Sequence, residues 1–393
     1  MMRNNSSVPV RRVMITAAGT VTAQSLIKAL RDDARAEFIA AGDMNPLCAT
    51  RAFVDEFVLL PPAGEPDFAS RCLEAAKRLR IDLLVPLIVE SEFLPLDDAR
   101  AHFESIGCRL LLPPREIVVR AGDKLEFATY LREIGVPGPL TVAYSAEMTV
   151  ERFPVYLKPR RGSGSVGTAR IESLHSLREA ARGRTELIVQ EAVEGTEFTV
   201  DSFAAAPGRV VAAVPRERIA IKAGVSVKGR TYRHPVIEGI VASVVEKIGL
   251  QGPANVQGML RSDGSFSIIE MNPRFSGTLA LTTAAGINFA SLLIDMIEGK
   301  PIADLLGRHE DGVTMMRYWS EVFEARTGEI RLGTALEAVR RHDPGLSPKL
   351  EAERRADERM IEPFQTAVAR QAPQGSERGQ NEAHGVKRPN VGS

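Results

Sequence analysis

Residues 254–274 constrain the fold of this chain more than any other stretch. Their sequence is ANVQGMLRSDGSFSIIEMNPR. The dipeptide Asp263-Gly264 stands between two strand-like patterns, which is a strong signal for a β-hairpin with a two-residue turn. In that turn Ser262 pairs with Ser265, so the sequence predicts two antiparallel strands with a defined register.

The predicted register aligns polar side chains on one face of the hairpin. Counting outward from the turn, Gln257 lies opposite Glu270, and Asn255 lies opposite Asn272. Side chains at i and i+2 share a face, so these four form one patch, and Arg274 continues it. Carboxylate and amide oxygens suit Mg²⁺, which often binds substrate phosphates as well. The alternative is a solvated polar face, although the apolar residues of the second strand favour a buried setting.

The chain before residue 114 alternates strand-like and helix-like patterns. Short strands are expected at 12–16, 37–41, 81–86 and 108–112, and helices at 22–30 and 67–79. This alternation predicts βαβ units with a parallel sheet, so residues 1–113 are expected to form a Rossmann-like domain.

The pattern changes after residue 114. A helical segment at 115–134 precedes paired strands at 155–158, 168–172, 187–190 and 197–204, with helices at 236–248 and 289–298. The fold class is therefore a combination of α/β and α+β. We expect a second domain over 114–305 with a lid subdomain at 140–192, and a helical or mixed extension over 306–367. Residues 368–393 carry almost no large apolar side chain, which predicts a disordered tail.

Length and composition exclude several classes of protein. A chain of 393 residues exceeds one ordinary domain. Its 50 basic and 50 acidic residues argue against a broad basic surface for nucleic acid or anionic lipid. The three cysteines (Cys48, Cys72 and Cys108) form no C-x-x-C pair, which favours a reducing cytoplasm. The polar N-terminus and short apolar runs predict neither a signal peptide nor a membrane span.

The sequence KPRRGSGSVG at 158–167 contains the spacing G-x-G-x-x-G. A strand-like pattern follows it instead of the helix that a dinucleotide-binding motif requires. It also lacks the Gly-Lys-Ser/Thr ending of a Walker A loop. The loop is therefore expected to join two antiparallel strands and to close its backbone N–H groups over phosphate oxygens, with a bare hairpin as the alternative.

Two lysines accompany this loop in a chain where lysine is scarce, with ten lysines against forty arginines. Lys158 directly precedes the loop, and Lys124 begins a predicted helix. A lysine facing a nucleotide supplies a compact positive charge to phosphate, whereas the alternative is a solvated surface residue.

These motifs together resemble the ATP-grasp superfamily over roughly residues 12–300. The resemblance rests on Lys158 with the glycine loop, on IVQEAVEGTE at 188–197, and on Gln257 with IEMNPR at 269–274. The chain is most similar to the synthetase halves of the carbamoyl phosphate synthetase large subunit and to small amino-acid ligases built on the same plan. The resemblance implies an ATP-grasp domain over 114–305.

The resemblance also implies roles for individual residues. The candidates for ATP contacts are Lys124, Lys158, Gly162, Ser163, Gly164, Ser165, Gly167, Glu191, Ala192, Val193, Glu197 and Lys222. Of these, Glu191 to Val193 would line the adenine and Glu197 would bind the ribose, whereas carbamoyl phosphate synthetase prefers another residue in place of Lys222. Mg²⁺, or Mn²⁺ in its place, would be held by Gln257, Glu270 and Asn272. Arg274 and Lys158 would act in catalysis.

The implied activity is an ATP-dependent carboxylate–amine ligase. Such an enzyme phosphorylates a carboxylate and transfers the acyl group to an amine, which gives an amide or peptide bond, ADP and phosphate. The candidate contacts for the two small-molecule substrates are Ser276, Gly277 and Thr278 after the metal motif, and Glu90 and Glu92 after a strand expected at 84–89. For these two glutamates an ordinary solvated loop is the alternative. A homodimer is the family-level expectation.

Two other functions remain open from the sequence. One is a bicarbonate or carbamate kinase half like that of carbamoyl phosphate synthetase, although the chain shows no duplicate half after residue 300. The other is a non-catalytic ATP sensor. A sensor would not need to keep Lys158, Glu270, Asn272 and Arg274 together.

Overall fold

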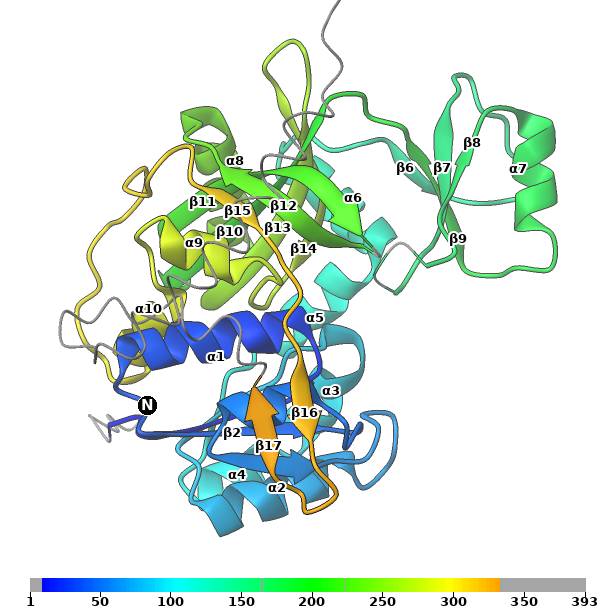
Figure 1. The fold of residues 1–393 in the computed structure, drawn as a ribbon. Helices are drawn as coiled ribbons and strands as arrows, with labels where there is room; N and C mark the ends of the chain where they lie inside the picture. Colours follow the sequence, from blue (N-terminus) through cyan, green and yellow to red (C-terminus); the bar gives the residue numbers. More distant parts are fainter. Residues whose placement is uncertain (1–8, 163, 165, 223, 333–393) are drawn as a thin grey trace, which may run out of the picture. The chain divides into compact units, whose positions relative to one another are not determined.

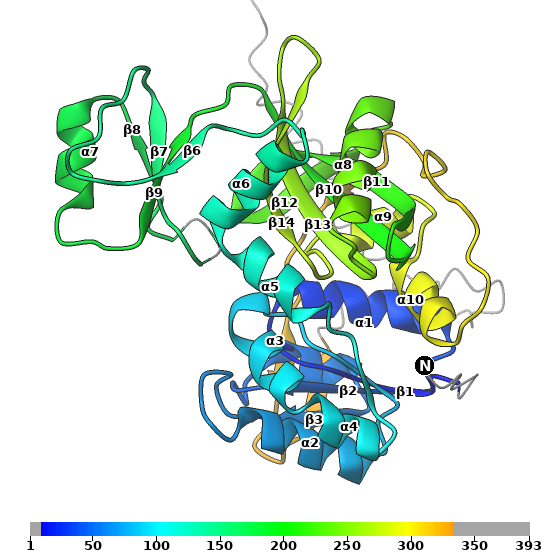
Figure 2. The same cartoon turned by 180° about the vertical axis from the view of Figure 1, so that it is seen from behind.

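The computed structural model describes residues 9–162, 164, 166–222 and 224–332. Residues Met1–Leu332 belong to one compact unit. Its described strands form sheets of five, four, six and two strands (Figures 1 and 2). Ser163, Ser165, most of the expected extension and the expected tail at 368–393 lie outside the described residues.

The first sheet contains five parallel strands in the order β3-β2-β1-β4-β5. Its strands are β1 (Arg12–Ile15), β2 (Phe38–Asp43), β3 (Glu56–Leu59), β4 (Leu83–Val85) and β5 (Arg109–Leu110). The accompanying helices are α1 (Val21–Asp33), α2 (Phe68–Leu79), α3 (Val89–Asp98) and α4 (Arg100–Ser105), with a 3₁₀ helix at Ala49–Phe53. Thr20 caps α1 by accepting a hydrogen bond from the backbone of Ala23. The predicted parallel sheet is confirmed.

Two predicted elements near this sheet were wrong in their bounds. The helical segment at 115–134 is two helices, α5 (Arg115–Gly122) and α6 (Lys124–Glu133), because Asp123 has extended backbone angles and caps the second helix. The strand expected to reach Val89 ends at Val85. Glu90 and Glu92 therefore belong to α3 instead of following a strand.

The second sheet is antiparallel in the order β6-β9-β7-β8 (Figure 1). It comprises β6 (Thr141–Ala143), β7 (Val155–Pro159), β8 (Ala169–Ile171) and β9 (Leu187–Glu191), with α7 (Leu174–Ala181) between the last two. The glycine loop joins β7 to β8, which pair antiparallel. The predicted antiparallel connection is therefore confirmed.

The third sheet has the order β14-β13-β10-β11-β12-β15. Its strands are β10 (Thr196–Ala206), β11 (Arg209–Lys222), β12 (Val225–Thr231), β13 (Gly252–Leu260), β14 (Phe266–Asn272) and β15 (Thr314–Met316). The remaining elements are α8 (Pro235–Lys247), α9 (Leu279–Ala284), α10 (Phe289–Ile297) and the hairpin of β16 (Val322–Glu324) and β17 (Ile330–Leu332). None of the described helices is long and apolar enough to cross a bilayer.

The two faces of the six-stranded sheet pack against different helices. Phe198, Val200 and Val256 share a buried cluster with Ile237 and Val241 of α8. On the opposite face Phe203 packs edge-on against Phe289 of α10, with ring centroids 5.5 Å apart, and α1 contributes to the same cluster. This second face carries the polar patch described below.

The β13–β14 hairpin has a longer turn than predicted. Leu260 pairs with Phe266, and the backbone N–H of Arg261 donates to Ser265, so the predicted pairing of Ser262 with Ser265 was wrong. A β-bulge at Ile269 then adds one residue to β14. The bulge offsets the longer turn and restores the predicted pairs.

Both predicted strand pairs are therefore confirmed. Gln257 lies opposite Glu270, and Asn255 lies opposite Asn272.

Two glycines provide a test of this packing. A Cβ on Gly258, beside the bulge, would lie 2.4 Å from Phe266 Cζ and 2.6 Å from the Ser267 carbonyl oxygen, whereas a Cβ on Gly239 in α8 would meet nothing within 4 Å. Gly258→Ala is expected to lower the free energy of unfolding by about 1–3 kcal/mol. Gly239→Ala is expected to raise it by about 0.5–1 kcal/mol. Urea unfolding of both variants measures the two changes, and equal effects would contradict the packing.

Candidate active site

One face of the six-stranded sheet carries two rows of polar residues. In the first row Glu270, Gln257, Thr199 and Arg216 follow one another across β14, β13, β10 and β11. In the second row Asn272, Asn255 and Asp201 follow one another across β14, β13 and β10. Residues paired across strands share a face, so the hairpin patch predicted from the sequence extends over two further strands.

The metal-ligand candidates lie at one edge of this face. Gln257, Glu270 and Asn272 are half-buried, and Asn272 Nδ2 donates to Glu270 Oε1 at 3.2 Å. Within the described part of the chain, no group of three or more His, Cys, Asp or Glu side chains could hold a metal ion. A metal here would therefore depend on amide oxygens beside a single carboxylate. These oxygen donors fit Mg²⁺, which prefers oxygen ligands.

Lys158 faces this patch from β7 of the four-stranded sheet. Its ammonium donates to Gln190 Oε1 at 2.6 Å, and Gln190 Nε2 donates to Thr141 Oγ1 at 3.0 Å. Burial lowers the pKa of Lys158, the carboxylates of Glu270 and Glu197 oppose that change, and Lys124 adds to it. The structure thus brings Lys158 close to the predicted metal carboxylate, to Glu197 and to Lys124.

A buried carboxylate fastens α6 to the start of the glycine loop. Asp123 is 1% exposed; it accepts backbone hydrogen bonds from Leu125 and Glu126 and pairs with Arg160 Nε at 2.8 Å. Burial alone would raise the pKa of Asp123, but the hydrogen bond from Arg160 and the cap hold it below its ordinary value. This pair positions Lys124, whose Nζ donates to the carbonyl of Gly162 at 2.6 Å.

The glycine loop has the backbone that its sequence requires. Gly162, Gly164 and Gly167 have φ angles of 106°, 66° and 72°, which residues with a Cβ rarely adopt. A Cβ on Gly224 would lie 3.9 Å from the Gly164 carbonyl oxygen. The loop therefore approaches the turn between β11 and β12.

The adenine candidates lie where β9 leaves the four-stranded sheet. Glu191, Ala192 and Val193 are half-buried. The side chain of Glu191 accepts hydrogen bonds from Arg261 Nη2 at 3.1 Å and from the backbone N–H of Leu140 at 3.2 Å. Its carboxylate thus links the β13–β14 turn to the first strand of the four-stranded sheet.

Glu197 and Lys222 have partners that the sequence did not indicate. Glu197 pairs with Arg218 of β11, which also donates to the Gly224 carbonyl oxygen at 3.0 Å. A ribose at Glu197 would therefore lie beside a guanidinium. Lys222 is exposed at the end of β11, and its Nζ lies 5.1 Å from the ring centroid of Trp319.

The first group of substrate candidates lies against the N-terminal part of the chain. Ser276 and Thr278 are buried, and Ser276 Oγ accepts a hydrogen bond from Arg216 Nη2 at 3.1 Å. The carbonyl oxygen of Gly277 accepts one from Ser25 Oγ of α1 at 3.3 Å. The segment after the metal motif therefore contacts the polar sheet face and the beginning of α1.

The other substrate candidates lie apart from this face. Glu92 is 3% exposed, and its Oε2 accepts hydrogen bonds from Thr16 Oγ1 at 2.7 Å and from the backbone of Leu87 and Ile88 at 2.9 Å. Burial raises the pKa of Glu92. The carboxylate of Glu92 therefore stabilises the segment between β4 and α3. The side chain of Glu90 lies outside the described part of the chain.

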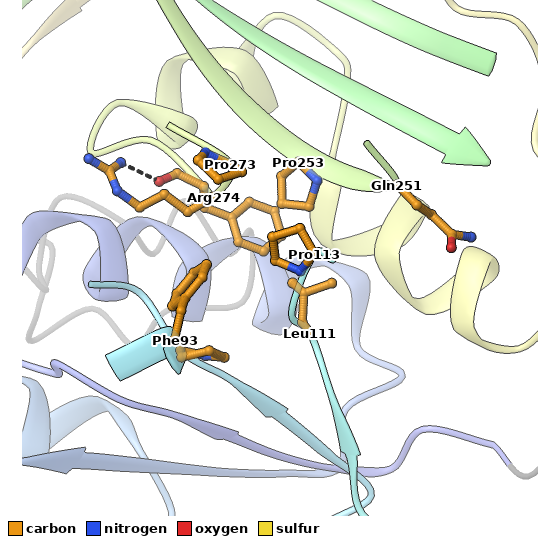
Figure 3. Close-up of a pocket in the computed structure, with 9 residues that line it drawn as sticks. Phe93, Leu111, Pro113, Gln251, Pro253, Pro273 and Arg274 are labelled. Atoms are coloured by element: carbon orange, nitrogen blue, oxygen red, sulfur yellow. Dashed lines mark hydrogen bonds between the residues drawn. The ribbon is translucent and has the colours of Figure 1, made fainter. Parts of the chain in front are cut away.

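Arg274 borders a small pocket, shown in Figure 3. Its lining is mostly apolar and consists of Pro86, Phe93, Leu111, Pro113, Gln251, Pro253, Pro273, Arg274 and Phe275. A volume of about 10 Å³ leaves room for about one water molecule, so this pocket is no nucleotide site. The guanidinium of Arg274 donates to the Phe275 carbonyl oxygen at 2.8 Å and points away from Leu111 and Pro113 (Figure 3).

Two family models match this chain. Residues 183–317 match the family described as "ATP-grasp in the biosynthetic pathway with Ter operon", and residues 13–111 match "PylC-like, N-terminal domain". Among solved structures, an L-amino acid ligase from Bacillus licheniformis superposes with a TM-score of 0.61 at 16% identity, over 81% of this chain and 83% of that one. The chain has the ATP-grasp fold.

Known proteins of related sequence include ATP-grasp enzymes. The carbamoyl phosphate synthase large chain, N-terminal section, of Methanopyrus kandleri is 24% identical over 324 residues, which is 67% of this chain and 57% of that protein. The D-alanine–D-alanine ligase of Ectopseudomonas mendocina is 25% identical over 205 residues, or 45% of this chain and 64% of that protein. The match thus spans less than two thirds of either relative's own length.

Several residues around the candidate ATP-grasp site were missed in the sequence. They are Asp123, Gln190, Asp201, Arg216 and Arg218. Two of them had a visible signal, because Arg216 and Arg218 lie at i and i+2 in the strand-like stretch VPRERIAIK. The strand pairing of β10 with β11 was needed to connect that stretch to the β13–β14 hairpin.

Proposed function

We propose that this protein is an ATP-dependent ligase that joins a small-molecule carboxylate to an amine. The observation that carries the proposal is the strand register, which sets Gln257 opposite Glu270 on the sheet face that Lys158 approaches. A single carboxylate with amide oxygens beside a half-buried lysine suits a metal-bound triphosphate. We also propose a cytoplasmic location and a homodimer.

In this proposal the residues have separate tasks. Lys124, Lys158 and the glycine loop hold the phosphates of ATP, and Glu191 to Val193 line the adenine. Gln257, Glu270 and Asn272 would hold Mg²⁺. Bound there, the ion would neutralise charge on the phosphate oxygens. Arg274 holds the transferred phosphoryl group through its guanidinium.

The reaction has two displacements. An oxygen of the substrate carboxylate attacks the γ-phosphorus, the bond to the bridging β,γ-oxygen breaks, and ADP leaves. The amine nitrogen then attacks the acyl carbon, and the C–O bond to phosphate breaks as the amine loses a proton to the departing phosphate. Positioning and charge neutralisation supply most of the catalysis in such transfers.

Carboxylate-dependent ADP release tests this function. The full chain is incubated with MgATP and pools of carboxylates and amino acids, hydroxylamine is added to trap an acyl phosphate as its hydroxamate, and products are identified by mass spectrometry. We expect ADP release that requires a carboxylate and gives an amide.

Two outcomes would favour the alternatives. Release supported by bicarbonate alone would favour a bicarbonate kinase. ATP binding without release under any carboxylate would favour a sensor.

A further inference from the structure

Two arginines lie beside the candidate substrate segment with a single acidic partner between them. Arg216 is 2% exposed and pairs with Asp201, which also accepts hydrogen bonds from Asn255 Nδ2 at 3.2 Å and Thr282 Oγ1 at 2.6 Å. Arg317, directly after β15, is half-buried, and no Asp or Glu of the described residues forms an ion pair with it. Burying charges without a matching counter-charge is costly, so this excess positive charge needs an explanation.

Both guanidiniums point to the same short segment. Arg216 Nη2 donates to Ser276 Oγ at 3.1 Å, and Arg317 Nη2 donates to the Gly277 carbonyl oxygen. Arg317 Nε donates to the Ser226 carbonyl oxygen at 3.2 Å. Burial lowers the pKa of Arg317, and the charge of Arg216 lowers it further, which agrees with their proximity. The arrangement concentrates positive charge beside Ser276 and Gly277.

Some N–H donors of Arg216 and Arg317 have no hydrogen-bond partner among the described residues. Arg216 Nε is buried and makes no hydrogen bond. The hydrogen bonds of Arg317 to side-chain or backbone oxygens use Nε and Nη2, and both acceptors are neutral carbonyls. The positive charge of Arg317 is therefore not offset by its hydrogen-bond acceptors, so an anionic ligand beside its guanidinium would be favoured.

The separation between Arg216 and the metal-ligand candidates limits the size of the ligand. Arg216 lies opposite Thr199, and Thr199 lies opposite Gln257, so two strand spacings separate Arg216 from the metal hairpin. Neighbouring strands are about 4.8 Å apart, which gives a separation of about 10 Å on one sheet face. A small molecule can span that separation with one group at the metal edge and an anionic group beside Ser276 and Gly277, the segment to which both guanidiniums donate.

We propose that Arg317 binds a free carboxylate of the substrate, one that is not phosphorylated, with Arg216 as a positioning residue acting through Ser276. The substrate is then an amino acid or a dicarboxylic acid. This inference rests on the proposed function for the reacting group, but the anion site itself does not depend on turnover.

The sole tryptophan of the chain offers a readout without catalysis. Trp319 lies two residues from Arg317, and the residue is 79% exposed, with its ring near Lys222. We titrate the full chain with succinate or with L-alanine, in the presence of a non-hydrolysable ATP analogue, while recording Trp319 fluorescence. Succinate or L-alanine is expected to give a saturable change, and the stronger of the two identifies the substrate class.

Three variants separate the anion site from the rest of the protein. Arg317→Gln is expected to weaken succinate or L-alanine binding by about 10- to 100-fold, because a charge-assisted hydrogen bond is lost, and Arg317→Lys to restore part of it. Arg230→Gln, at an exposed position of β12, is the matched control and should leave binding unchanged. ATP-analogue affinity and the melting temperature should be similar in all three variants.

The outcomes distinguish this inference from the proposed function. Equal binding by wild type and Arg317→Gln, or no binding of either probe, overturns the anion site even if ligase activity is found. Arg317-dependent binding without any ADP release supports the anion site and counts against the ligase. A change confined to ATP-analogue affinity would assign Arg317 to the nucleotide and overturn the inference.

Discussion

Replacing Lys158 by methionine is expected to lower kcat/KM for carboxylate-dependent ADP release by about 100- to 1000-fold. The ammonium of Lys158 lies near Glu270, Glu197 and Lys124, where the proposed function places the triphosphate. Methionine keeps the length of the side chain and removes its charge, so it tests charge neutralisation directly. A steady-state ADP assay with the carboxylate that supports release in the wild type measures the change.

The Lys158→Met variant is expected to stay folded. Burial lowers the pKa of Lys158, which means that keeping the lysine charged in the folded protein costs free energy. Methionine carries no charge and does not have this cost. The loss of the donor to the buried Gln190 Oε1 acts in the opposite direction. In the wild type, the part of stability linked to Lys158 rises as the pH climbs from its lowered pKa toward about 10.4, and this rise should be absent in the variant.

Urea unfolding across this pH range measures that difference. Lys77→Met, at an exposed position of α2, is the control for both assays. Wild-type turnover in Lys158→Met would remove this lysine from the proposed site.

Replacing Glu270 by glutamine is expected to reduce turnover by more than about 100-fold and to raise the Mg²⁺ concentration needed for half-maximal activity. Glu270 is the only carboxylate of the proposed metal set, so the substitution removes its whole negative charge. Glutamine keeps an oxygen that can accept the hydrogen bond from Asn272 Nδ2, so the hairpin should retain its structure. Activity measured against Mg²⁺ and Mn²⁺ concentration tests this expectation.

The same substitution should also change Lys158. Glu270 favours the charged form of Lys158, so its removal lowers the pKa of the lysine further. The alkaline limb of the pH–rate profile should then move to lower pH in Glu270→Gln.

The double variant Lys158→Met/Glu270→Gln and a control variant complete this test. Because the two residues interact, the double variant should lose less activity than the product of the single losses. Independent effects would place them in separate sites. Glu74→Gln in α2, exposed and paired with Arg71 at 2.8 Å, is the matched control.

The β13–β14 hairpin has some features that the local sequence predicts and others that depend on tertiary structure. The Asp-Gly signal located the turn correctly, but the turn is longer than two residues and β14 carries a bulge. The two deviations offset each other, so the pairs Gln257–Glu270 and Asn255–Asn272 match the simple count. The bulge is a feature of the strand pairing, because β14 accommodates the extra residue while Gly258 lets Phe266 pack closely. No local pattern in the sequence predicts this bulge.

The sequence by itself determined the parallel and antiparallel sheets, the glycine loop and the order of polar residues along the β13–β14 hairpin. These depend on periodicity, turn residues and backbone conformation, which act over a few neighbouring residues. Only the tertiary structure decided that Asp123 clamps Arg160, that Glu197 pairs with Arg218 and that Glu92 faces inward. It also decided that Arg216 and Arg317, 101 positions apart in the chain, meet at Ser276 and Gly277. Such contacts join segments far apart in sequence, and packing and charge in the folded chain decide which residues meet.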